Sequence, residues 1–371
     1  MAENREYQSD AQIPDSEEAK EFEVTYCERF APLLQALNSS LIVSSYSANS
    51  LLLLSSSDGE NIHVSSVYVP RLLGIAINPE QNKLTFAAYG QLLHYQRLEN
   101  PHQHKVLETL DKEKDVFFVP CSSTVTGFLN THDMAYTEQG LVFVNSSFSC
   151  IATTHPDRSF KPLWQPHFIS ELTPEDRCHL NGMAVVNGQP EFVSCFTSSD
   201  AAYSWKSELS HQGVIIRTAD NFILCDGLSL PHSPRFHQGK LYFCESGAGR
   251  LWCIENPYAA SKDELNITCV GEYPGFTRGL KCVGDLALMG LSRLRPAKDG
   301  SKRNTDMPIL QKQEETWGGI VAVDLRSGEM VARMQFSEEV AQIYDVDLLA
   351  ESVNPHIFAW DAEEVSEVYL F

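Results

Sequence analysis

The sequence predicts an all-β fold, a six-bladed β-propeller, on three observations. Short runs rich in β-branched and aromatic residues follow one another from residue 40 to residue 336, with Gly, Asn, Asp and Ser between them. A short motif recurs six times, each time just ahead of a turn and a strong strand. The two ends of the chain carry only partial units, which can complete each other.

The composition is that of an ordinary globular protein, and it limits the partners. The 371 residues include 28 Lys and Arg against 49 Asp and Glu, a net charge of −21. Because such a chain is repelled by phosphate and by anionic lipid, we expect no nucleic-acid or membrane partner. There is no signal sequence and no apolar stretch of about 18 residues, so we expect a soluble cytoplasmic protein. Ten cysteines without a CxxC pair argue against a zinc ribbon.

Two segments precede the strands. Residues 1–22 are polar and acidic and are predicted to be a flexible leader, so that residues 23–371 form a single propeller domain. Apolar residues at positions 30, 33, 34 and 37 recur at helical spacing. They predict one short amphipathic helix between about residues 27 and 37.

The strands are predicted from their composition and from the turn residues that bound them. The predicted strands cover residues 40–46, 49–57, 61–69, 83–89, 91–96, 141–147, 191–196, 213–218, 221–225, 240–246, 250–255, 286–292, 318–325 and 329–336. Many short strands at this spacing are typical of a barrel, a sandwich or a propeller.

The repeated motif favours the propeller. Its first positions are Leu73, His132, Asn181, His232, Arg278 and Tyr344, and its second positions are Gly74, Asp133, Gly182, Ser233, Gly279 and Asp345. Residues 131–146 and 231–246 align without a gap. Successive copies lie 46 to 66 residues apart, slightly more than the roughly 40–50 residues of a four-stranded blade. A large β-sandwich is the alternative, but it does not explain why the motif begins equivalent strands.

Six copies of the motif predict six blades. The strands before residue 70 precede the first copy, and the sixth copy, at 344–347, has little chain after it. We therefore expect the N-terminal strands to pair with the C-terminal inner strand in one shared blade, which hides both edges. The polar segment 295–315, in the longest interval, is predicted to be a surface loop.

The motif also indicates where a functional site lies. The first strand of each blade lines the central channel, so the first motif positions converge at its mouth, and five of the six are polar or ionisable. Converging polar groups are typical of a ligand site, with a solvated channel mouth as the alternative. The predicted catalytic residues are His132, His232, Asp133 and His179, because imidazoles titrate near neutrality and a carboxylate can orient them.

A ligand for this mouth is predicted from the remaining residues. The predicted substrate-binding residues are Arg278, Asn181, Arg235 and Tyr344, and a guanidinium suits an anionic or carbonyl-bearing small molecule or peptide. A divalent metal (Fe, Zn, Cu or Ca) is the other interpretation, with ligands drawn from His132, His179, His232, Asn181 and Asp345. Because GxGxxG, GxxxxGK[ST] and GxSxG motifs are absent, no nucleotide or flavin is expected.

Two classes of function stay open on these residues. The first is an enzyme of hydrolase or lyase type, or one with metal-assisted chemistry, acting at the channel mouth. The second is a non-catalytic propeller scaffold for a protein or small-molecule partner. The unusual residues fall on the starts of the inner strands and not on a rim of exposed aromatics, which favours the enzyme.

Several blocks of the sequence resemble a bacterial family of uncharacterised conserved proteins from cyanobacteria and proteobacteria. The blocks are HDMAY, LVFVNSSFSCIAT, SFKPLWQPHFIS, EDRCHLNGMA, LSLPHSPRFHQGKLYFCESGAG, PGFTRGL and YDV, within roughly residues 35 to 350. This resemblance implies a propeller-like fold and names no reaction. HLNGMAVVNGQPEF is more distantly similar to the NGLA inner-strand motif of six-bladed propellers related to gluconolactonase, senescence marker protein and strictosidine synthase.

The distant resemblance carries an expectation about a metal. In the metal-dependent members of that group an Asn of the motif helps to bind a divalent cation, which implies this role for Asn181. The carboxylates would then come from Asp133 or Asp345. His132 and His232 depart from the pattern of those propellers.

Overall fold

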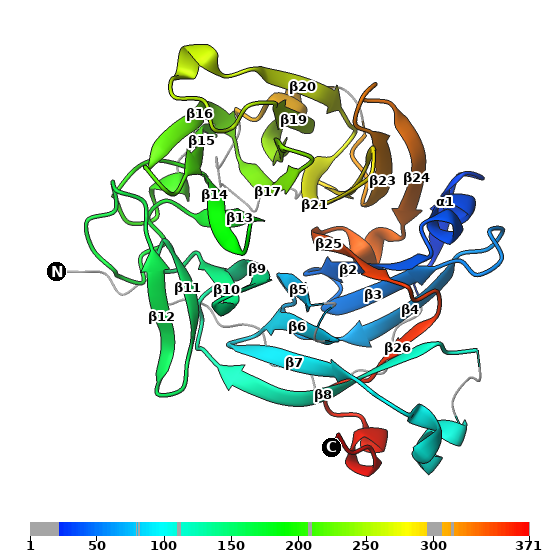
Figure 1. The fold of residues 1–371 in the computed structure, drawn as a ribbon. Coiled ribbons are helices and arrows are strands. Elements are labelled where there is room, and N and C mark those ends of the chain that lie inside the picture. Colours follow the sequence, from blue (N-terminus) through cyan, green and yellow to red (C-terminus); the bar gives the residue numbers. More distant parts are fainter. Residues whose placement is uncertain are drawn as a thin grey trace.

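The computed structural model describes residues 22–78, 80, 82–109, 113–206, 210–294, 306–312 and 315–370. Within them, six sheets are arranged around one axis (Figure 1), so the predicted all-β six-bladed propeller is confirmed. We number the blades along the chain, starting with the sheet that contains residues 75–78. Blade 6 is the sheet that contains both ends of the repeat.

Each blade has four strands that run from the axis outwards. The innermost strands are β5 (Ile75–Asn78), β9 (Thr131–Thr137), β13 (Leu180–Val186), β17 (Pro231–His237), β21 (Phe276–Val283) and β25 (Ile343–Ala350). The second strands are β6 (Lys83–Ala88), β10 (Gly140–Asn145), β14 (Gln189–Cys195), β18 (Lys240–Glu245), β22 (Leu286–Ser292) and β2 (Ser39–Ser45). The third strands are β7 (Gln91–Arg97), β11 (Cys150–His155), β15 (His211–Arg217), β19 (Arg250–Ile254), β23 (Gly319–Asp324) and β3 (Ser50–Ser55). The outer strands are β8 (Val116–Val125), β12 (Arg158–Trp164), β16 (Phe222–Ser229), β20 (Ile267–Glu272), β24 (Met330–Phe336) and β4 (His63–Tyr68).

Blade 6 joins the two ends of the chain. Its strand order is β25-β2-β3-β4, and the antiparallel β25–β2 pair runs from Ser39↔Ala350 to Ser45↔Ile343. Each inner strand packs against the inner strand of the next blade, and β25 packs against β5. The ring is therefore held shut by the hydrogen bonds between β25 and β2.

Two further strands extend the neighbouring blades. β1 (Val24–Tyr26) pairs with β24 at the edge of blade 5, and β26 (Pro355–Ile357) pairs in parallel with β8 at the edge of blade 1. Each of these pairings covers part of an outer edge that would otherwise present unpaired backbone groups.

The core lies between the blades. Six clusters of buried hydrophobic side chains each combine residues of two neighbouring sheets. The second strands supply much of this core because they are covered on both faces, and every residue of β2 is buried. The outer strands face solvent, and most of β12 is exposed.

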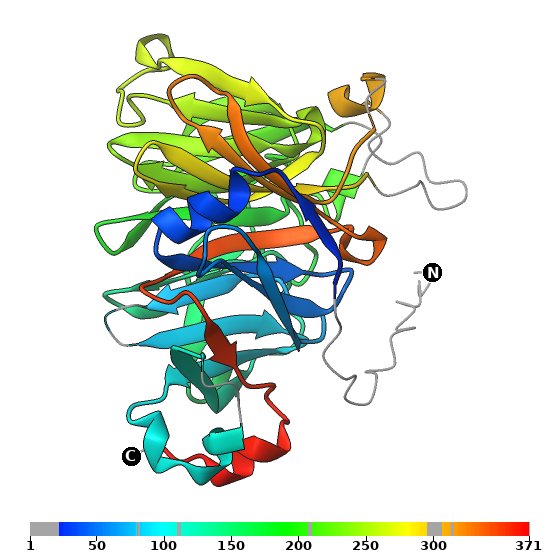
Figure 2. The same ribbon diagram turned by 90° about the vertical axis from the view of Figure 1, so that its right-hand side faces the viewer.

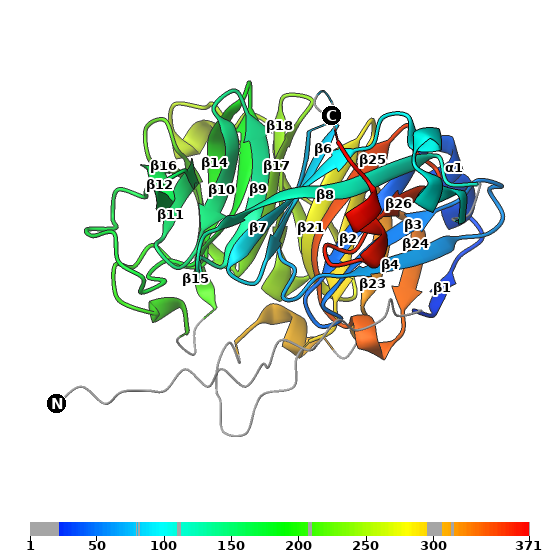
Figure 3. The same cartoon turned by 90° about the horizontal axis from the view of Figure 1, so that it is seen from below.

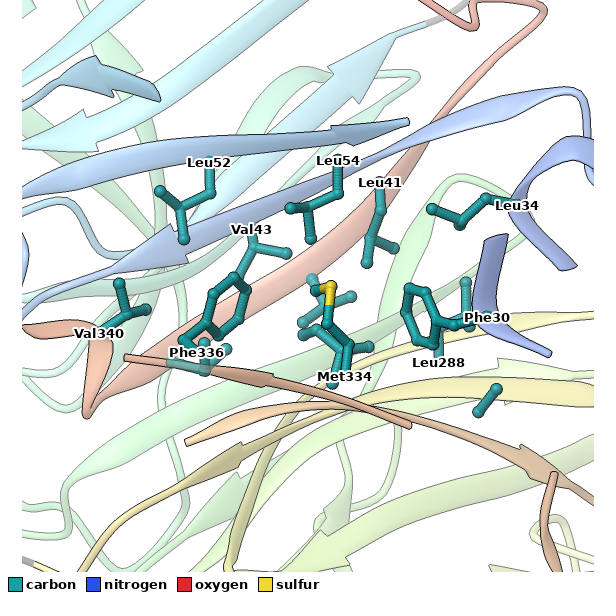
Figure 4. Packing of buried hydrophobic residues seen from close by; sticks show 14 of the residues in the cluster. Phe30, Leu34, Leu41, Val43, Leu52, Leu54, Leu288, Met334, Phe336 and Val340 are labelled. Carbon is teal, nitrogen blue, oxygen red and sulfur yellow. The ribbon is translucent and has the colours of Figure 1, made fainter. Parts of the chain in front are cut away.

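The predicted short helix is present as α1 (Phe30–Ala36). It packs against β2, β3 and β24, across the junction of blades 5 and 6 (Figure 2). Its buried residues Phe30 and Leu34 join a cluster that includes Leu41 of β2, Leu288 of β22 and Met334 of β24 (Figure 4). The helix therefore seals the outer end of the interface next to the shared blade.

The face on which the inner strands begin also carries short 3-10 helices, and we call it the mouth face. Figure 3 shows η3 (Ser204–Lys206), η6 (Pro308–Gln311) and η7 (Glu338–Val340), in green, gold and orange, on this side of the ring. None of the helices in the described residues is long and apolar enough to cross a membrane.

Two predicted segments fall partly outside the described residues. These are residues 1–21 of the expected leader and residues 295–305 and 313–314 of the expected surface loop. Phe22, the last residue assigned to the leader, is buried in the cluster that contains α1. The described part of the loop includes η6, where Leu310 is exposed and Ile309 is buried.

Candidate functional site

The second motif positions connect neighbouring blades. Side-chain acceptors alternate with glycines around the ring. Each acceptor takes a backbone N–H of the next blade: Asp133 Oδ2 from Met183 (3.0 Å), Ser233 Oγ from Gly279 (3.0 Å) and Asp345 Oδ2 from Ile75 (3.2 Å). The polar residues predicted at these positions therefore close the inner ring.

The glycines between them allow neighbouring blades to approach closely at the other three junctions. A Cβ atom on Gly74 would lie 3.2 Å from the Cα of Asp133, and one on Gly279 would lie 3.0 Å from the Cα of Asp345. A Cβ on Gly182 would lie 2.6 Å from Cδ of Pro234. A side chain at any of the three would push two blades apart.

Arg235 is the centre of an ion cluster within the ring. Its Nη1 donates to Asp133 Oδ2 at 2.8 Å and its Nη2 to Asp345 Oδ1 at 3.3 Å, while its Nε donates to the carbonyl oxygen of Leu280. Blades 2, 4 and 6 are thereby joined through one guanidinium. Arg235 is predicted to hold an anionic substrate, but in the structure its anions are two carboxylates of the protein itself.

The same cluster contains two predicted functional carboxylates. Burial raises the pKa of Asp345 to about 7, and the nearby Asp133 adds to this effect while Arg235 opposes it. Asp133, a predicted catalytic residue, and Asp345, a predicted metal ligand, both bind Arg235 and backbone amides. Within the described residues, both carboxylates therefore contact groups of other blades and help to close the inner ring.

His132 is held by its Nδ1 atom. Nδ1 lies 2.6 Å from the carbonyl oxygen of Asn130 and 2.8 Å from Oγ of Ser146, whose hydroxyl donates to the carbonyl oxygen of Leu180 in the next blade. Because a carbonyl oxygen only accepts, Nδ1 carries the proton. Nε2 is therefore an acceptor, and Tyr344 donates its hydroxyl to it at 3.0 Å.

His232 repeats this arrangement one hundred residues later. Its Nδ1 lies 3.0 Å from the carbonyl oxygen of Leu230 and 2.7 Å from Oγ of Ser246, whose hydroxyl donates to Thr277 of the next blade. The proton is again on Nδ1. The predicted equivalence of 131–146 and 231–246 thus extends to the hydrogen bonds of both histidines.

His179 is held by a carboxylate. It lies in the loop before β13 with a left-handed backbone (φ 47°), and its Nδ1 is 2.9 Å from Oδ2 of Asp176. Trp205 donates its indole N–H to the same oxygen, and its ring packs against the imidazole with the ring centres 4.0 Å apart. Asp176 and Trp205 therefore fix both the position of this ring and the nitrogen that carries its proton.

The three imidazoles lie close to one another. The rings of His132 and His179 are in edge contact at 4.8 Å, and Phe196 lies between His179 (4.5 Å) and His232 (5.0 Å). Burial lowers the pKa of His132 and of His232 well below the usual value, and the Arg278 cation lowers both further. Both rings are therefore neutral at physiological pH.

Arg278 and Tyr344 complete the site. The guanidinium carbon of Arg278 lies 3.2 Å from the centre of the Tyr344 ring, a cation–π contact between blades 5 and 6. Tyr344 in turn reaches His132 of blade 2 across the start of blade 1. The predicted substrate-binding residues Arg278 and Tyr344 and the predicted catalytic residue His132 thus form a chain of contacts at the mouth face.

Asn181 is oriented by the protein. Its Nδ2 donates to the carbonyl oxygen of His179 at 3.2 Å, and its Oδ1 accepts the hydroxyl of Ser194 at 2.8 Å. Within the described residues, no group of three or more His, Cys, Asp or Glu side chains is placed to hold a metal ion. Two surface hollows of about 440 and 540 Å³ lie at blades 1 and 2, and none of the predicted site residues lines them.

Sequence reasoning missed the residues that orient the histidines. Ser146 and Ser246 end the two aligned segments at equivalent positions, so the alignment itself carries that signal. Asp176 contacts His179, whereas the adjacent Arg177 binds Glu175 and Asp200. Trp205 lies in a separate loop, and nothing in the sequence indicates that it contacts His179.

Several solved structures are similar to this chain at low sequence identity. A chain from the crystal structure of a nidogen/laminin complex has a TM-score of 0.53 at 10% identity, over 84% of this chain and 99% of that one, which agrees with the fold. A gluconolactonase from Xanthomonas campestris has a TM-score of 0.46 at 14% identity, over 80% and 84%. A calcium-binding regucalcin from Agrobacterium tumefaciens has a TM-score of 0.42 at 10% identity, over 71% and 73%. No curated protein matches the sequence. One family model, described as Domain of unknown function (DUF4915), matches residues 28–358.

Proposed function

The chain belongs to the family described as Domain of unknown function (DUF4915), and we propose that it is an enzyme that transfers protons on a small anionic molecule at the mouth face. One observation carries this proposal. Three imidazoles with defined tautomers, His132, His179 and His232, lie together beside the guanidinium of Arg278. Contacts that only hold the blades together would not require imidazoles, nor a fixed orientation of the second ring nitrogen of each.

His179 is the proposed general base. The Asp176 carboxylate accepts its Nδ1–H and orients the ring, as the carboxylate of a catalytic triad does. Nε2 is left with a lone pair, and it has no hydrogen-bond partner among the described residues. That nitrogen can accept a proton from a substrate or from a water molecule.

Arg278 is the proposed anion-binding group. A guanidinium stays charged at working pH and binds a carboxylate or phosphate through two N–H groups. The Tyr344 ring lies against this guanidinium, and the Tyr344 hydroxyl donates a hydrogen bond to His132. An acid–base step beside a bound anion is the chemistry of hydrolases and lyases that act on carboxylate-bearing substrates.

A divalent metal is a second interpretation of the same histidines. Each donates Nδ1–H to a carbonyl, hydroxyl or carboxylate oxygen, which is how metal-bound histidines are oriented. A metal would supply Lewis-acid activation of a carbonyl or of water. Because the described residues form no three-ligand group as they stand, the proposed reaction uses the imidazoles themselves.

The test is a substrate screen with a matched pair of variants. Lactones and carboxylate esters are scored for acid release, and hydroxy acids for the ultraviolet absorbance of an unsaturated product, with and without added Zn²⁺ or Ca²⁺. His179→Gln should lower kcat about 10²–10⁴-fold. His155→Gln, in the β11–β12 hairpin of blade 2, serves as the control.

Two outcomes would contradict the proposal. A substrate whose turnover is the same in wild type and in His179→Gln would place catalysis elsewhere. Binding of anions that depends on Arg278, without turnover of any member of the panel, would favour the non-catalytic scaffold.

A further inference from the structure

The loop that carries His179 has a strained backbone. Asp176 and His179 both adopt left-handed backbone angles, with φ of 44° and 47°. Residues with a side chain rarely take this conformation, because Cβ then lies too close to the backbone. Such a loop keeps its shape only where its surroundings hold it. The contacts that hold this loop therefore also determine where the imidazole lies.

A second loop at the mouth face holds the first one (Figure 3). It is the part of the β14–β15 connection that covers residues 199–206, and we call it the clasp. The backbone N–H of Tyr203 donates to the carbonyl oxygen of Glu175 at 3.0 Å. The hydroxyl of Ser204 donates to the carbonyl oxygen of Arg177 at 3.0 Å. The clasp thus bonds to the backbone on both sides of Asp176.

An ion pair fastens the clasp at a further point. Asp200 of the clasp accepts a hydrogen bond from the guanidinium of Arg177 at 2.8 Å and one from the backbone N–H of Ser170 at 3.0 Å. The two loops are therefore joined by backbone, hydroxyl and charged contacts, and they form one unit around the imidazole.

Trp205 is the residue through which the clasp reaches His179. Nδ1 of His179 lies 3.0 Å from Oδ1 and 2.9 Å from Oδ2 of Asp176, and the indole N–H of Trp205 donates to Oδ2 at 3.0 Å. A carboxylate bonded to the imidazole alone could turn about its Cβ–Cγ bond, whereas a second donor on one oxygen fixes its plane. The indole ring also covers the face of the imidazole, with the ring centres 4.0 Å apart.

These contacts leave the imidazole little freedom. Asp176 and His179 are only 6% and 8% exposed, so water does not compete freely for the bond between them. The direction of Nε2 is set once Nδ1 and one face of the ring are held. Proton transfer depends strongly on this direction, because a misplacement of about 1 Å can cost roughly a hundredfold in rate.

We propose that Trp205 is a positioning residue for His179, which it orients through Asp176, and that the clasp holds Trp205 in this place. The inference rests on the proposed function, in which His179 is the general base. Trp205 contacts the orienting carboxylate and the face of the ring, and it takes no part in the proton transfer itself.

The chain offers a matched control for this indole. Trp252 also donates its indole N–H to a buried carboxylate, that of Glu245, at 2.8 Å. In the part of the chain that the structure describes, no imidazole binds this second carboxylate. Trp252→Phe therefore removes the same kind of bond as Trp205→Phe without touching a histidine.

The first measurement needs no substrate. The exchange of the His179 Nδ1 proton with solvent is followed by NMR of the ¹⁵N-labelled full chain, and His179→Gln assigns the signal. Trp205→Phe keeps an aromatic ring beside the imidazole but removes the donor to Asp176. We expect its exchange to be about tenfold faster than in wild type, as the loss of one hydrogen bond to a charged group implies. Trp252→Phe should leave this exchange unchanged.

The second measurement is kinetic and uses a substrate found in the screen described above. Trp205→Phe should lower kcat about 10–10²-fold and leave KM unchanged, because the base is misaligned while substrate binding is kept. Ser204→Ala removes one bond of the clasp and keeps the indole. It should change the exchange and kcat in the same direction, by less.

The outcomes separate this inference from the proposed function. Exchange at the wild-type rate in Trp205→Phe would overturn the positioning role, and so would equal acceleration in both tryptophan variants. If Trp205→Phe does not fold, unchanged exchange in Ser204→Ala would overturn it. Faster exchange in Trp205→Phe, together with full turnover by His179→Gln, would contradict the proposed base and leave the orientation of the imidazole by Trp205 standing.

Discussion

At the scale of single residues, the buried histidines make the fold sensitive to acid. Burial lowers the pKa of His132 and His232 well below 6.5, further lowered by Arg278 and by neighbouring imidazoles. In the unfolded chain both take up a proton near pH 6.5, so below that pH the unfolded state binds more protons. The stability they contribute is complete above pH 6.5 and is lost as the pH falls towards the folded pKa.

We therefore expect the melting temperature of the wild type to decrease below pH 6.5, and that of His232→Phe to decrease less. Differential scanning calorimetry between pH 8 and pH 5 measures both. Parallel curves for the two proteins would contradict the prediction, because they would show that His232 titrates alike in the folded and unfolded states.

The contribution of Asp345 to stability depends on pH in the opposite direction. Burial raises its pKa from 3.8 to about 7, so the stability from its protonated form is complete below pH 3.8 and is lost as the pH rises through 7. Asp345→Asn keeps a neutral side chain at every pH. We expect it to raise the melting temperature relative to wild type at pH 8 and to change it less at pH 5. A loss of equal size at both values would mean that the charged pair with Arg235 is stabilising.

The site residues divide into those with a signal in the sequence and those without one. The motif placed His132, His232, Arg278 and Tyr344 at equivalent strand starts, and in the structure they lie at the mouth face. Whether Arg235 meets a substrate or a carboxylate of another blade depends on contacts across the ring, over about one hundred residues of chain. Period and spacing carry no information about such a contact.

At the scale of elements, the junctions between inner strands are the tightest points of the fold. Gly182 of β13 lies against Pro234 and Ser233 of β17, with no space for a methyl group. We expect Gly182→Ala to destabilise the protein by about 1–3 kcal/mol through overpacking. Urea unfolding measures this free energy.

Gly239→Ala is the comparison for this substitution. Gly239 lies in the β17–β18 hairpin with φ 80°, and a Cβ there would meet nothing within 4 Å. Its cost is only that of the left-handed backbone, about 1 kcal/mol. If Gly182→Ala keeps the stability of wild type, the inner strands are less tightly packed than the structure has them.

The strands that the sequence did not predict are mainly outer ones. β12 and β20 have mostly exposed or half-buried side chains, so they lack the alternation of apolar residues that marks a strand. β8 and β12 each contain a proline, Pro120 and Pro162, which argues against a strand in a sequence pattern. Both prolines are tolerated because outer strands have an edge without a partner over part of their length.

At the scale of the whole molecule, the ring depends on its last inner strand. Truncation after Ala341 removes β25 with its buried residues Ile343, Val346 and Leu349, and it exposes the edge of β2 and the core that these side chains cover. We expect this variant to show no cooperative melting transition. Truncation after Asn354 removes β26 and leaves β25, and it should lower the melting temperature by only several degrees. A variant ending at Ala341 that melts like the full chain would contradict closure through β25.

The blade count was predictable because the motif reports contacts that every blade must make. Its second position alternates acceptor and glycine: the acceptors bond to the next blade at three of the six junctions, and the glycines allow close approach at the other three. The contributions of the terminal strands β1 and β26 were not predictable, because a three-residue strand has no period of its own.

The placement of β1 and β26 has a mechanical consequence. They attach to blades 5 and 1, on either side of the blade that joins the two ends. A pulling force applied between the termini therefore meets two three-residue pairings before it reaches the longer β25–β2 ladder. Under tension, the protein should release its terminal strands at low force and keep the ring intact to a higher one, so a single-molecule extension trace should contain two short early steps before the main rupture.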